Sequence, residues 1–194
     1  MTKISIAAAS AATEADLSSA RLGQRFGRLD LQSQLALLAA SSLKINFNEF
    51  APDRIGICLA ASAGSLSTDV NFWNGRDSAG GPSPTLFAYT LPSAAVGEIA
   101  IHFRLTGRNL CFVGDDKILL AEAADLIRRG EADGCICIFC EVVTTGCGKL
   151  ISAAPIAEAR AIFLKRGEGL RELRELDRDM KPLCALISQT KSAG

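Results

Sequence analysis

The chain is organised around residues 105–134, which read LTGRNLCFVGDDKILLAEAADLIRRGEADG. The apolar run from Asn109 to Val113 is long enough for a buried strand and too short for a helix. Gly114, Asp115 and Asp116 break this run, and a carboxylate at such a point can accept the free amides of a helix start. The stretch therefore predicts a strand, a sharp turn and a helix.

The helix is predicted over residues 117–129, because its apolar residues recur at helical spacing. These residues are Leu119, Ala123, Leu126 and Ile127. Asp125 stands four residues before Arg129, which predicts an ion pair on the exposed face. Two arginines and Gly130 then provide the end of the helix.

The rest of the chain alternates between strand and helix patterns, which favours a parallel-containing sheet between helices. Further strands are predicted over residues 3–9, 54–60, 135–143, 159–165 and 183–188. Helices are predicted over residues 29–43 and 68–74 and after Pro92, and residues 78–84 are predicted to form a loop. The strand at residues 54–60 is apolar throughout, so we expect helices to cover both of its faces.

Composition excludes several classes of partner. The 194 residues contain 21 basic and 21 acidic side chains, so net charge indicates neither a nucleic acid nor a membrane surface. No apolar run approaches the roughly 18 residues of a membrane span, and the first residues do not form a signal peptide. Seven cysteines, an odd number, indicate reduced thiols and a cytoplasmic location. The hydrophobic content of 48% suggests an apolar face reserved for a partner.

No metal or cofactor site is predicted. Cys135 and Cys137 should lie on one face of their strand and Cys140 on the other, so the three thiols cannot converge on a metal. His102 is the only histidine, four residues after Glu98, where a surface or interface pair is the favoured role. Without a second base, no Ser/His/Asp set can be assembled.

Several stretches match the pattern of a known family. Gly107-Arg108-Asn109 precedes the strand, and residues 124–133 read ADLIRRGEAD. Residues 54–66 read RIGICLAASAGSL, and residues 83–107 read SPTLFAYTLPSAAVGEIAIHFRLTG. These stretches resemble the β-ketoacyl synthases of the thiolase-like superfamily. The resemblance implies an α/β fold that is a single thiolase-like half, with a five-stranded mixed sheet between helices. It also implies that residues 1–194 form one truncated β-ketoacyl synthase N-terminal-like domain, without the half that holds the family's two active-site histidines.

The chain departs from the family where the nucleophile belongs. In condensing enzymes a cysteine sits at the helix start, where the helix dipole stabilises its thiolate. Here Gly114, Asp115 and Asp116 occupy that position, and nearby carboxylates would raise the pKa of a thiol. Cys111 is the nearest cysteine, but it belongs to the strand. We therefore expect a degenerate turn, no catalytic residue and no autonomous condensation.

The resemblance implies a function that survives this loss. Chain-length factors of type II polyketide synthases are catalytically dead relatives that pair with an active ketosynthase. This chain is similar to such subunits in aryl polyene systems, with a full-length β-ketoacyl synthase as its partner. The implied interface is the strand Asn109, Leu110, Cys111, Phe112 and Val113. Tyr89, Pro92 and Val96 have helical spacing suited to reach the partner's acyl tunnel, with Phe87 and Phe112 nearby. The alternative is that these residues merely pack the interface or the core.

Two other functions stay open. The chain could be a self-associating scaffold or could bind an acyl carrier protein through arginines 21, 25 and 28 or 171, 174 and 178. Those arginines could equally form a solvated helix face. The last alternative is an unrecognised enzyme that uses Asp115 or Asp116 as a base.

Overall fold

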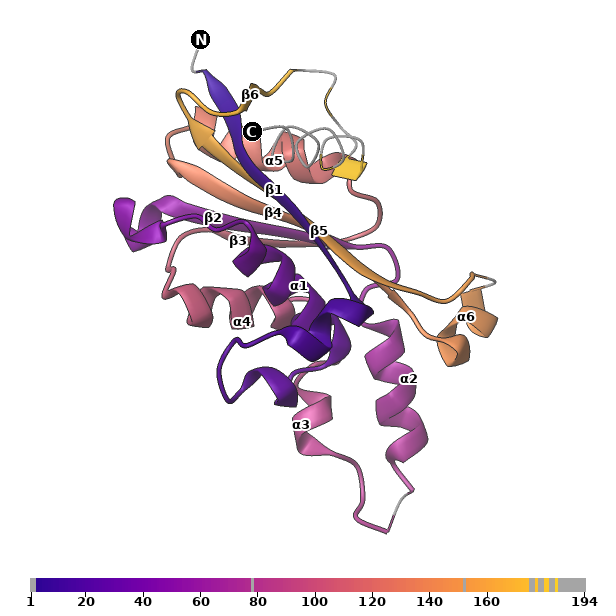
Figure 1. Cartoon of the computed structure of the whole chain (residues 1–194). Helices are drawn as coiled ribbons and strands as arrows, with labels where there is room; N and C mark the ends of the chain where they lie inside the picture. Colours follow the sequence, from indigo (N-terminus) through magenta and orange to yellow (C-terminus); the bar gives the residue numbers. More distant parts are fainter. Residues whose placement is uncertain are drawn as a thin grey trace.

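The protein is described by a computed structural model that covers residues 3–77, 79–151, 153–174, 177, 180, 181 and 184. The strands are β1 (Ile4–Thr13), β2 (Ile55–Ala61), β3 (Asn109–Val113), β4 (Gly134–Val143), β5 (Ile156–Arg166) and β6 (Arg171–Glu172) (Figure 1). The helices are α1 (Leu31–Ser42), α2 (Leu66–Gly75), α3 (Pro84–Phe87), α4 (Ala94–Phe103), α5 (Lys117–Arg128) and α6 (Thr145–Ile151). Short 3-10 turns connect several of them.

The described strands form one mixed sheet in the order β3-β2-β4-β5-β1-β6. β2 runs parallel to both β3 and β4, whereas β5 runs antiparallel to β4 and β1. The expected α/β class is confirmed, but the sheet has six strands and not five. The additional strand, β6, forms because the amides of Leu170 and Leu173 donate to the carbonyls of Ile6 and Ile4 and so align residues 171–172 with β1.

Most predicted elements are confirmed, with shifts at their ends. α1 begins at Leu31 and not at residue 29, because the Asp30 side chain accepts the Ser33 amide at 3.0 Å and caps the helix. β1 continues to Thr13, four residues beyond the prediction, because β5 pairs with it along this whole length. Of the strand predicted over residues 183–188, the structure describes only Cys184, which is helical, so the strand prediction is wrong at that residue.

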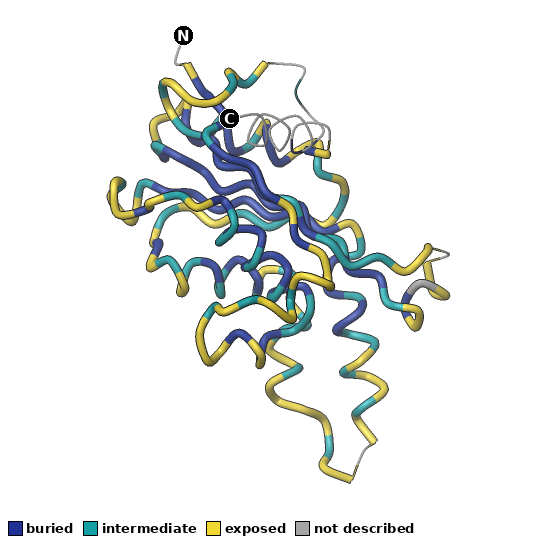
Figure 2. The backbone as a smooth tube through the Cα atoms, in the orientation of Figure 1, coloured by how far each residue is buried: buried dark blue, intermediate teal, exposed yellow. Residues whose placement is uncertain are grey.

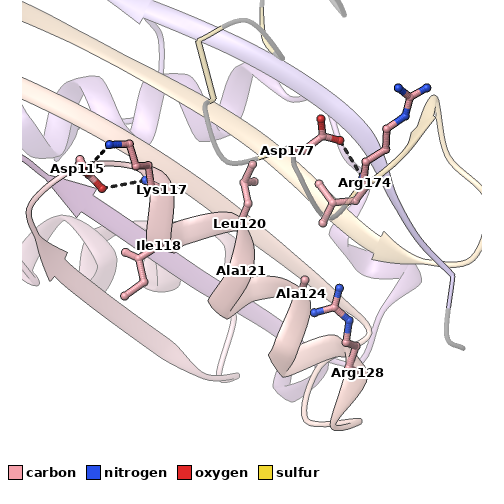
Figure 3. Close-up of a pocket in the computed structure, with 10 residues that line it drawn as sticks. Asp115, Lys117, Ile118, Leu120, Ala121, Ala124, Arg128, Arg174 and Asp177 are labelled. Atoms are coloured by element: carbon pink, nitrogen blue, oxygen red, sulfur yellow. Dashed lines mark hydrogen bonds and ion pairs between the residues drawn. The ribbon is translucent and has the colours of Figure 1, made fainter.

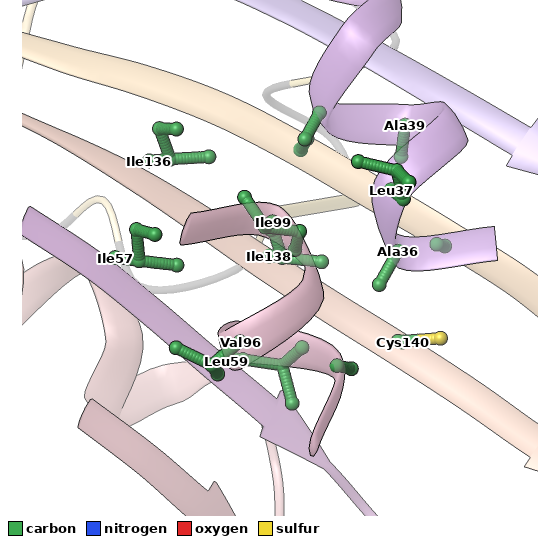
Figure 4. Close-up of a cluster of buried hydrophobic side chains, with 14 of the residues drawn as sticks. Ala36, Leu37, Ala39, Ile57, Leu59, Val96, Ile99, Ile136, Ile138 and Cys140 are labelled. Carbon is green, nitrogen blue, oxygen red and sulfur yellow. The ribbon is translucent and has the colours of Figure 1, made fainter. Parts of the chain in front are cut away.

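One face of the sheet is covered by α1 and α4. Figure 4 shows Val96 and Ile99 of α4 beside Ile57 and Leu59 of β2. α1 and the β4 residues on this face of the sheet belong to the same cluster. The members labelled there are Ala36, Leu37, Ala39, Ile136, Ile138 and Cys140.

The opposite face is covered by α5. Its buried residues include Leu119, Ala123, Leu126 and Ile127, as their spacing predicted. Cys135 and Cys137 belong to this face and Cys140 to the other, so the predicted alternation is confirmed. The whole of β2 is buried, which confirms the expected cover on both faces.

Burial falls away toward β3 and along α2 and α3, which extend from the sheet as an arm (Figure 2). Phe72 of α2 and Phe87 of α3 lie 5.4 Å apart, measured between ring centroids, and join the two helices. No described helix is long and apolar enough to cross a lipid bilayer.

Gly107, which precedes β3, is a required close approach. A Cβ atom there would lie 2.1 Å from the carbonyl oxygen of Ile55, which is backbone and cannot move aside. We therefore expect Gly107→Ala to lower the free energy of unfolding by at least about 2 kcal/mol, measured by chemical denaturation. Gly97→Ala in α4 is the matched control, because a Cβ atom there meets nothing within 4 Å and alanine favours a helix. Equal stability of the two variants would contradict the close approach.

Candidate interface at the edge strand

β3 forms one edge of the described sheet, with β2 on one side and no described strand on the other. The Ile57 amide donates to the Arg108 carbonyl, and the Gly114 amide donates to the Ala61 carbonyl. In the parallel register with β2, these two bonds direct the backbone groups of Leu110 and Phe112 toward β2. The amides and carbonyls of Asn109, Cys111 and Val113 therefore point outward.

The side chains of β3 are divided between the two faces of the sheet. Cys111 packs against the cluster under α1 and α4, whereas Leu110 and Phe112 pack against the cluster under α5. The ends of the strand are exposed, and the Val113 side chain is 69% exposed. The prediction of a fully buried strand is therefore wrong, because no further strand or helix among the described residues covers this edge.

The turn after β3 uses its carboxylates structurally. Gly114 has φ 143°, a conformation that favours glycine. Asp115 accepts the Lys117 amide at 3.2 Å and pairs with the Lys117 ammonium at 3.3 Å. Asp116 does not cap α5 with its side chain but accepts the amide of Met180 at 3.0 Å. The predicted capping by a carboxylate is thus supplied by Asp115 alone.

No activated thiol lies at this turn. Cys111 is half-buried inside the strand, and burial raises the pKa of its thiol. The backbone amide at the helix start is already taken by a carboxylate, so it does not form an anion pocket. This arrangement favours the thiol form of Cys111, which is the unreactive one.

The segment between α3 and α4 differs from the prediction. α3 ends at Phe87 and α4 begins at Ala94, so Tyr89 and Pro92 lie in a connection and not at helical spacing with Val96. Proline disfavours helix in the residue before it, which separates the two helices. The predicted helix start after Pro92 is confirmed, with Ser93 at the cap position.

Two of the predicted residues of this segment point inward. The Tyr89 hydroxyl donates to Glu98 Oε1 at 3.1 Å, and burial, with Glu98 nearby, raises the pKa of Tyr89. Val96 is 3% exposed and lies in the core. Phe87 is 61% exposed, so of these three residues it alone presents its side chain to solvent.

Glu98 is held by other partners than the predicted one. Arg25 donates to Glu98 Oε1 at 3.0 Å, on the same oxygen that Tyr89 contacts. The predicted Glu98–His102 pair is therefore wrong, and the His102 ring meets Phe103 edge-on at 4.7 Å between centroids. The predicted Asp125–Arg129 pair is also replaced, because Arg128, three residues after Asp125, donates to it at 2.7 Å and Arg129 pairs with Glu131.

The arginines suggested for an acidic partner are partly engaged within the chain. Arg21 donates to the carbonyls of Ser18 and Ala20. Arg171 pairs with Asp177 at 2.8 Å, in addition to the pair of Arg25 with Glu98. These contacts favour local structural roles for the three side chains.

An apolar surface continues from β3 to the arm. A Cβ atom on Gly64 would lie 3.4 Å from both Pro92 and Val113, so these two side chains are neighbours across Gly64. Leu91, which precedes Pro92, is 64% exposed. Sequence reasoning missed Leu91, although an apolar residue before a proline in a polar connection is a usable signal. We call Phe87, Leu91, Pro92 and Val113 the edge patch.

One hollow adjoins the edge strand and another adjoins the turn after it. One, of about 510 Å³, is lined by Cys111, Phe112, Val113, Gly114, Asp115 and Ile118. The other, of about 660 Å³, runs along α5 and is bordered by Leu173, Arg174 and Asp177 (Figure 3). Among the described residues, no group of three or more histidine, cysteine or acidic side chains is arranged to hold a metal ion.

The sequence matches no protein-family model and no curated protein. Several solved structures nevertheless match in fold. "The ishigamide ketosynthase/chain length factor" has a TM-score of 0.68 at 16% identity, over 87% of this chain and 64% of that chain. The ketosynthase ApeO in complex with its chain length factor ApeC from Xenorhabdus doucetiae has a TM-score of 0.65 at 17% identity, over 87% of this chain and 81% of that chain.

A third structure, AntDE:AntF, is a type II polyketide synthase acyl-carrier protein in complex with its ketosynthase. It has a TM-score of 0.68 at 13% identity, over 86% of this chain and 63% of that chain. The chain therefore has the thiolase-like fold of ketosynthase and chain length factor structures, as the resemblance predicted. It spans about two thirds of the length of the first and third of these chains.

The alternation of β3 amides between those bonded to β2 and those that point outward predicts a pattern of hydrogen–deuterium exchange rates. The amides of Leu110, Phe112 and Gly114 bond to β2, so we expect them to exchange slowly with deuterium. The amides of Asn109, Cys111 and Val113 should exchange faster, by about tenfold or more, in the isolated protein measured by NMR. Uniform protection along β3 would show that a strand already covers this edge.

Proposed function

We propose that this protein is a non-catalytic ketosynthase-like subunit, a chain-length factor that pairs with a full-length β-ketoacyl synthase. In this role it shapes the partner's acyl tunnel in type II polyketide or fatty-acid-like biosynthesis, of the aryl polyene kind. The observation that carries the proposal is the exposed edge of β3, where three residues direct their backbone groups outward. The solved structures of similar fold include ketosynthases in complex with chain length factors, which supports this reading.

The edge is suited to accept another strand. Proteins usually protect exposed edges with proline, bulges or inward charges, and β3 has none of these among its five residues. Unpaired backbone groups beside apolar side chains gain hydrogen bonds and lose apolar exposure when a strand is added. Pairing would therefore provide hydrogen-bond partners for the backbone groups of Asn109, Cys111 and Val113, and it would also cover the Val113 side chain.

The direction of the added strand follows from the hydrogen-bond phase. A partner with the same fold brings an equivalent edge, related by an approximate twofold axis. In a parallel pair, each residue whose backbone groups bond to the other strand lies opposite a residue whose groups point away from it. Two equivalent edges in the same register therefore cannot form a parallel ladder. In an antiparallel pair, bonding residues lie opposite each other. Cys111 then stands at the centre of the ladder, with Asn109 and Val113 at its ends.

The turn after β3 supports the absence of catalysis. A condensing nucleophile requires a thiol at the helix start and free amides for an oxyanion. Asp115 instead occupies the Lys117 amide, and Asp116 bonds to Met180. The active partner would therefore provide the cysteine and both histidines.

The edge patch supports the role in the tunnel. Phe87 and Leu91 are exposed, and Pro92 adjoins Val113 at the end of β3, so all four residues of the patch would face a partner paired there. Tyr89 and Val96 would act indirectly, because Tyr89 is bonded to Glu98 and Val96 is in the core. The most direct contact proposed is that of Phe87.

Self-association is the second candidate, and the charges at the ends of β3 favour it. In the antiparallel register between two copies, Arg108 of one copy lies beside Asp115 of the other, and both side chains are largely exposed. The two Cys111 Cα atoms would then be about 5.5 Å apart, which is within reach of a disulfide. A homodimer therefore has its own signature.

The first experiment is co-expression with a full-length ketosynthase encoded beside this chain, followed by native mass measurement. We expect a 1:1 heterodimer in which alkylation of Cys111, the only cysteine of the seven that is not buried, slows markedly. Val113→Lys should weaken association by about tenfold or more, because it places a charge on the edge strand that the partner would cover. Leu170→Lys is the matched control, since Leu170 is similarly exposed, at 57%, but adjoins the opposite edge of the sheet.

The result has clear alternatives. A homodimer that forms a Cys111 disulfide on mild oxidation and ignores the ketosynthase would replace the chain-length proposal with the scaffold. Equal effects of the two lysine variants would exclude the β3 edge as the interface.

A second experiment tests the tunnel. In the heterodimer, we expect Phe87→Ala to shift the products toward longer acyl chains, measured by mass spectrometry, without loss of association. Trp73→Ala is the control, because Trp73 is equally exposed on α2 but contacts Arg76, at 4.1 Å, within its own helix end. An unchanged product distribution in Phe87→Ala would contradict a contact of Phe87 with the tunnel.

A further inference from the structure

The described residues near the C-terminal end of the chain lie on the face of the sheet that α5 covers. Met180 is fully buried and Cys184 is 5% exposed, both in the cluster with Leu119 and Ala123 of α5. The Cys184 thiol also lies 3.9 Å from the Ala161 carbonyl of β5. These side chains therefore complete the apolar layer between α5 and the sheet.

Carboxylates bond to the backbone of these C-terminal residues at two points. Asp177 accepts the Arg174 amide at 2.8 Å and pairs with the Arg171 guanidinium at 2.8 Å. Asp116 accepts the Met180 amide at 3.0 Å. The Asp116 bond connects positions 64 residues apart and reaches from the turn after β3. Asp177, in contrast, acts within a few residues of its own position.

The hollow along α5 lies between this helix and the described residues after β6, and we call this boundary the seam. Figure 3 shows Ile118, Leu120, Ala121, Ala124 and Arg128 of α5 along one side, and Arg174 and Asp177 across from them. Its borders come from two parts of the chain, α5 and the residues after β6. Loss of one contact should therefore open the seam locally and leave the sheet intact.

We propose that Asp116 anchors the C-terminal residues Met180 and Cys184 onto the α5 face of the sheet. The turn that holds a nucleophile in condensing enzymes thus has a structural task in this chain. A hydrogen bond to an ionised carboxylate is stronger than one between neutral groups, and it fixes the Met180 backbone where its side chain enters the cluster. The anchor closes apolar surface that would otherwise be open to water. It is independent of the proposed pairing at β3.

Asp115 provides a matched control for this anchor. It is the neighbouring residue of the same type, but its side chain is 62% exposed and pairs with Lys117 within the turn. Its removal should affect the start of α5 and leave the Met180 contact in place. Asp115→Ala therefore controls for the loss of a charge at the turn. Asp116→Asn controls for the loss of the Asp116 charge, which adds to the effect of burial in raising the pKa of Cys184.

The test is the rate at which Cys184 reacts with a thiol reagent in the intact protein. Burial raises the pKa of Cys184 to about 11, so reaction requires opening of the seam. In a Cys111→Ser background, we expect Asp116→Ala to accelerate alkylation of Cys184 by about tenfold or more, located by peptide mass mapping. Asp115→Ala should keep the wild-type rate, and Asp116→Asn, which retains an acceptor, should fall between them.

Buried cysteines elsewhere distinguish local from global opening. Cys58 and Cys137 lie in the centre of the sheet and should stay unreactive in Asp116→Ala. A wild-type rate at Cys184 in the folded Asp116→Ala variant would overturn the proposal. Simultaneous reaction of Cys58, Cys137 and Cys184 would also overturn it, because Asp116 would then support the whole fold and not one seam.

Discussion

β3 is hydrogen-bonded to another described strand along one side only, and this is the constraint on which the rest of the structure depends. The sheet ends at this strand, so three of its residues have backbone groups bonded to no other described strand. Around it, Leu91 is exposed in the connection before α4 and Val113 is exposed at the end of β3. β2, one strand further in, is buried throughout. The difference between these neighbouring strands follows from the position of β3 at an edge of the described sheet.

In the same region, the fold depends on different residues from those that set the chemistry of the turn. Strand, turn and helix keep their order, because they depend on apolar spacing and on a glycine at the turn. The reactive position depends on one side chain at the helix start, and the two aspartates there are satisfied by backbone amides. The chemistry of this region is thus a local property of the turn, whereas the outward backbone groups belong to the strand before it.

The fold followed closely from the sequence, and the site only in part. The spacing of Leu119, Ala123, Leu126 and Ile127 predicted α5, and the continuous apolar run predicted the burial of β2. Sequence spacing could not predict which partner a charged side chain chooses. Glu98 binds Arg25, which lies 73 positions away, in preference to the residue one turn along the helix. Similarly, nothing in the local pattern indicates that Asp116 reaches Met180, because that contact depends on how the last elements return to the sheet.

The alternation of outward groups on β3 also limits what can be added to it. A strand shifted by one residue would present its non-bonding groups to Asn109, Cys111 and Val113, and its side chains would change faces. A shift by two residues restores the phase but leaves one end of this short ladder empty. The permitted registers of an added strand therefore differ by steps of two residues, and no intermediate register forms the hydrogen bonds. A synthetic five-residue peptide could pair with β3 in one of these registers. If the amides on its outer edge were N-methylated, no further strand could be added and the sheet would end there.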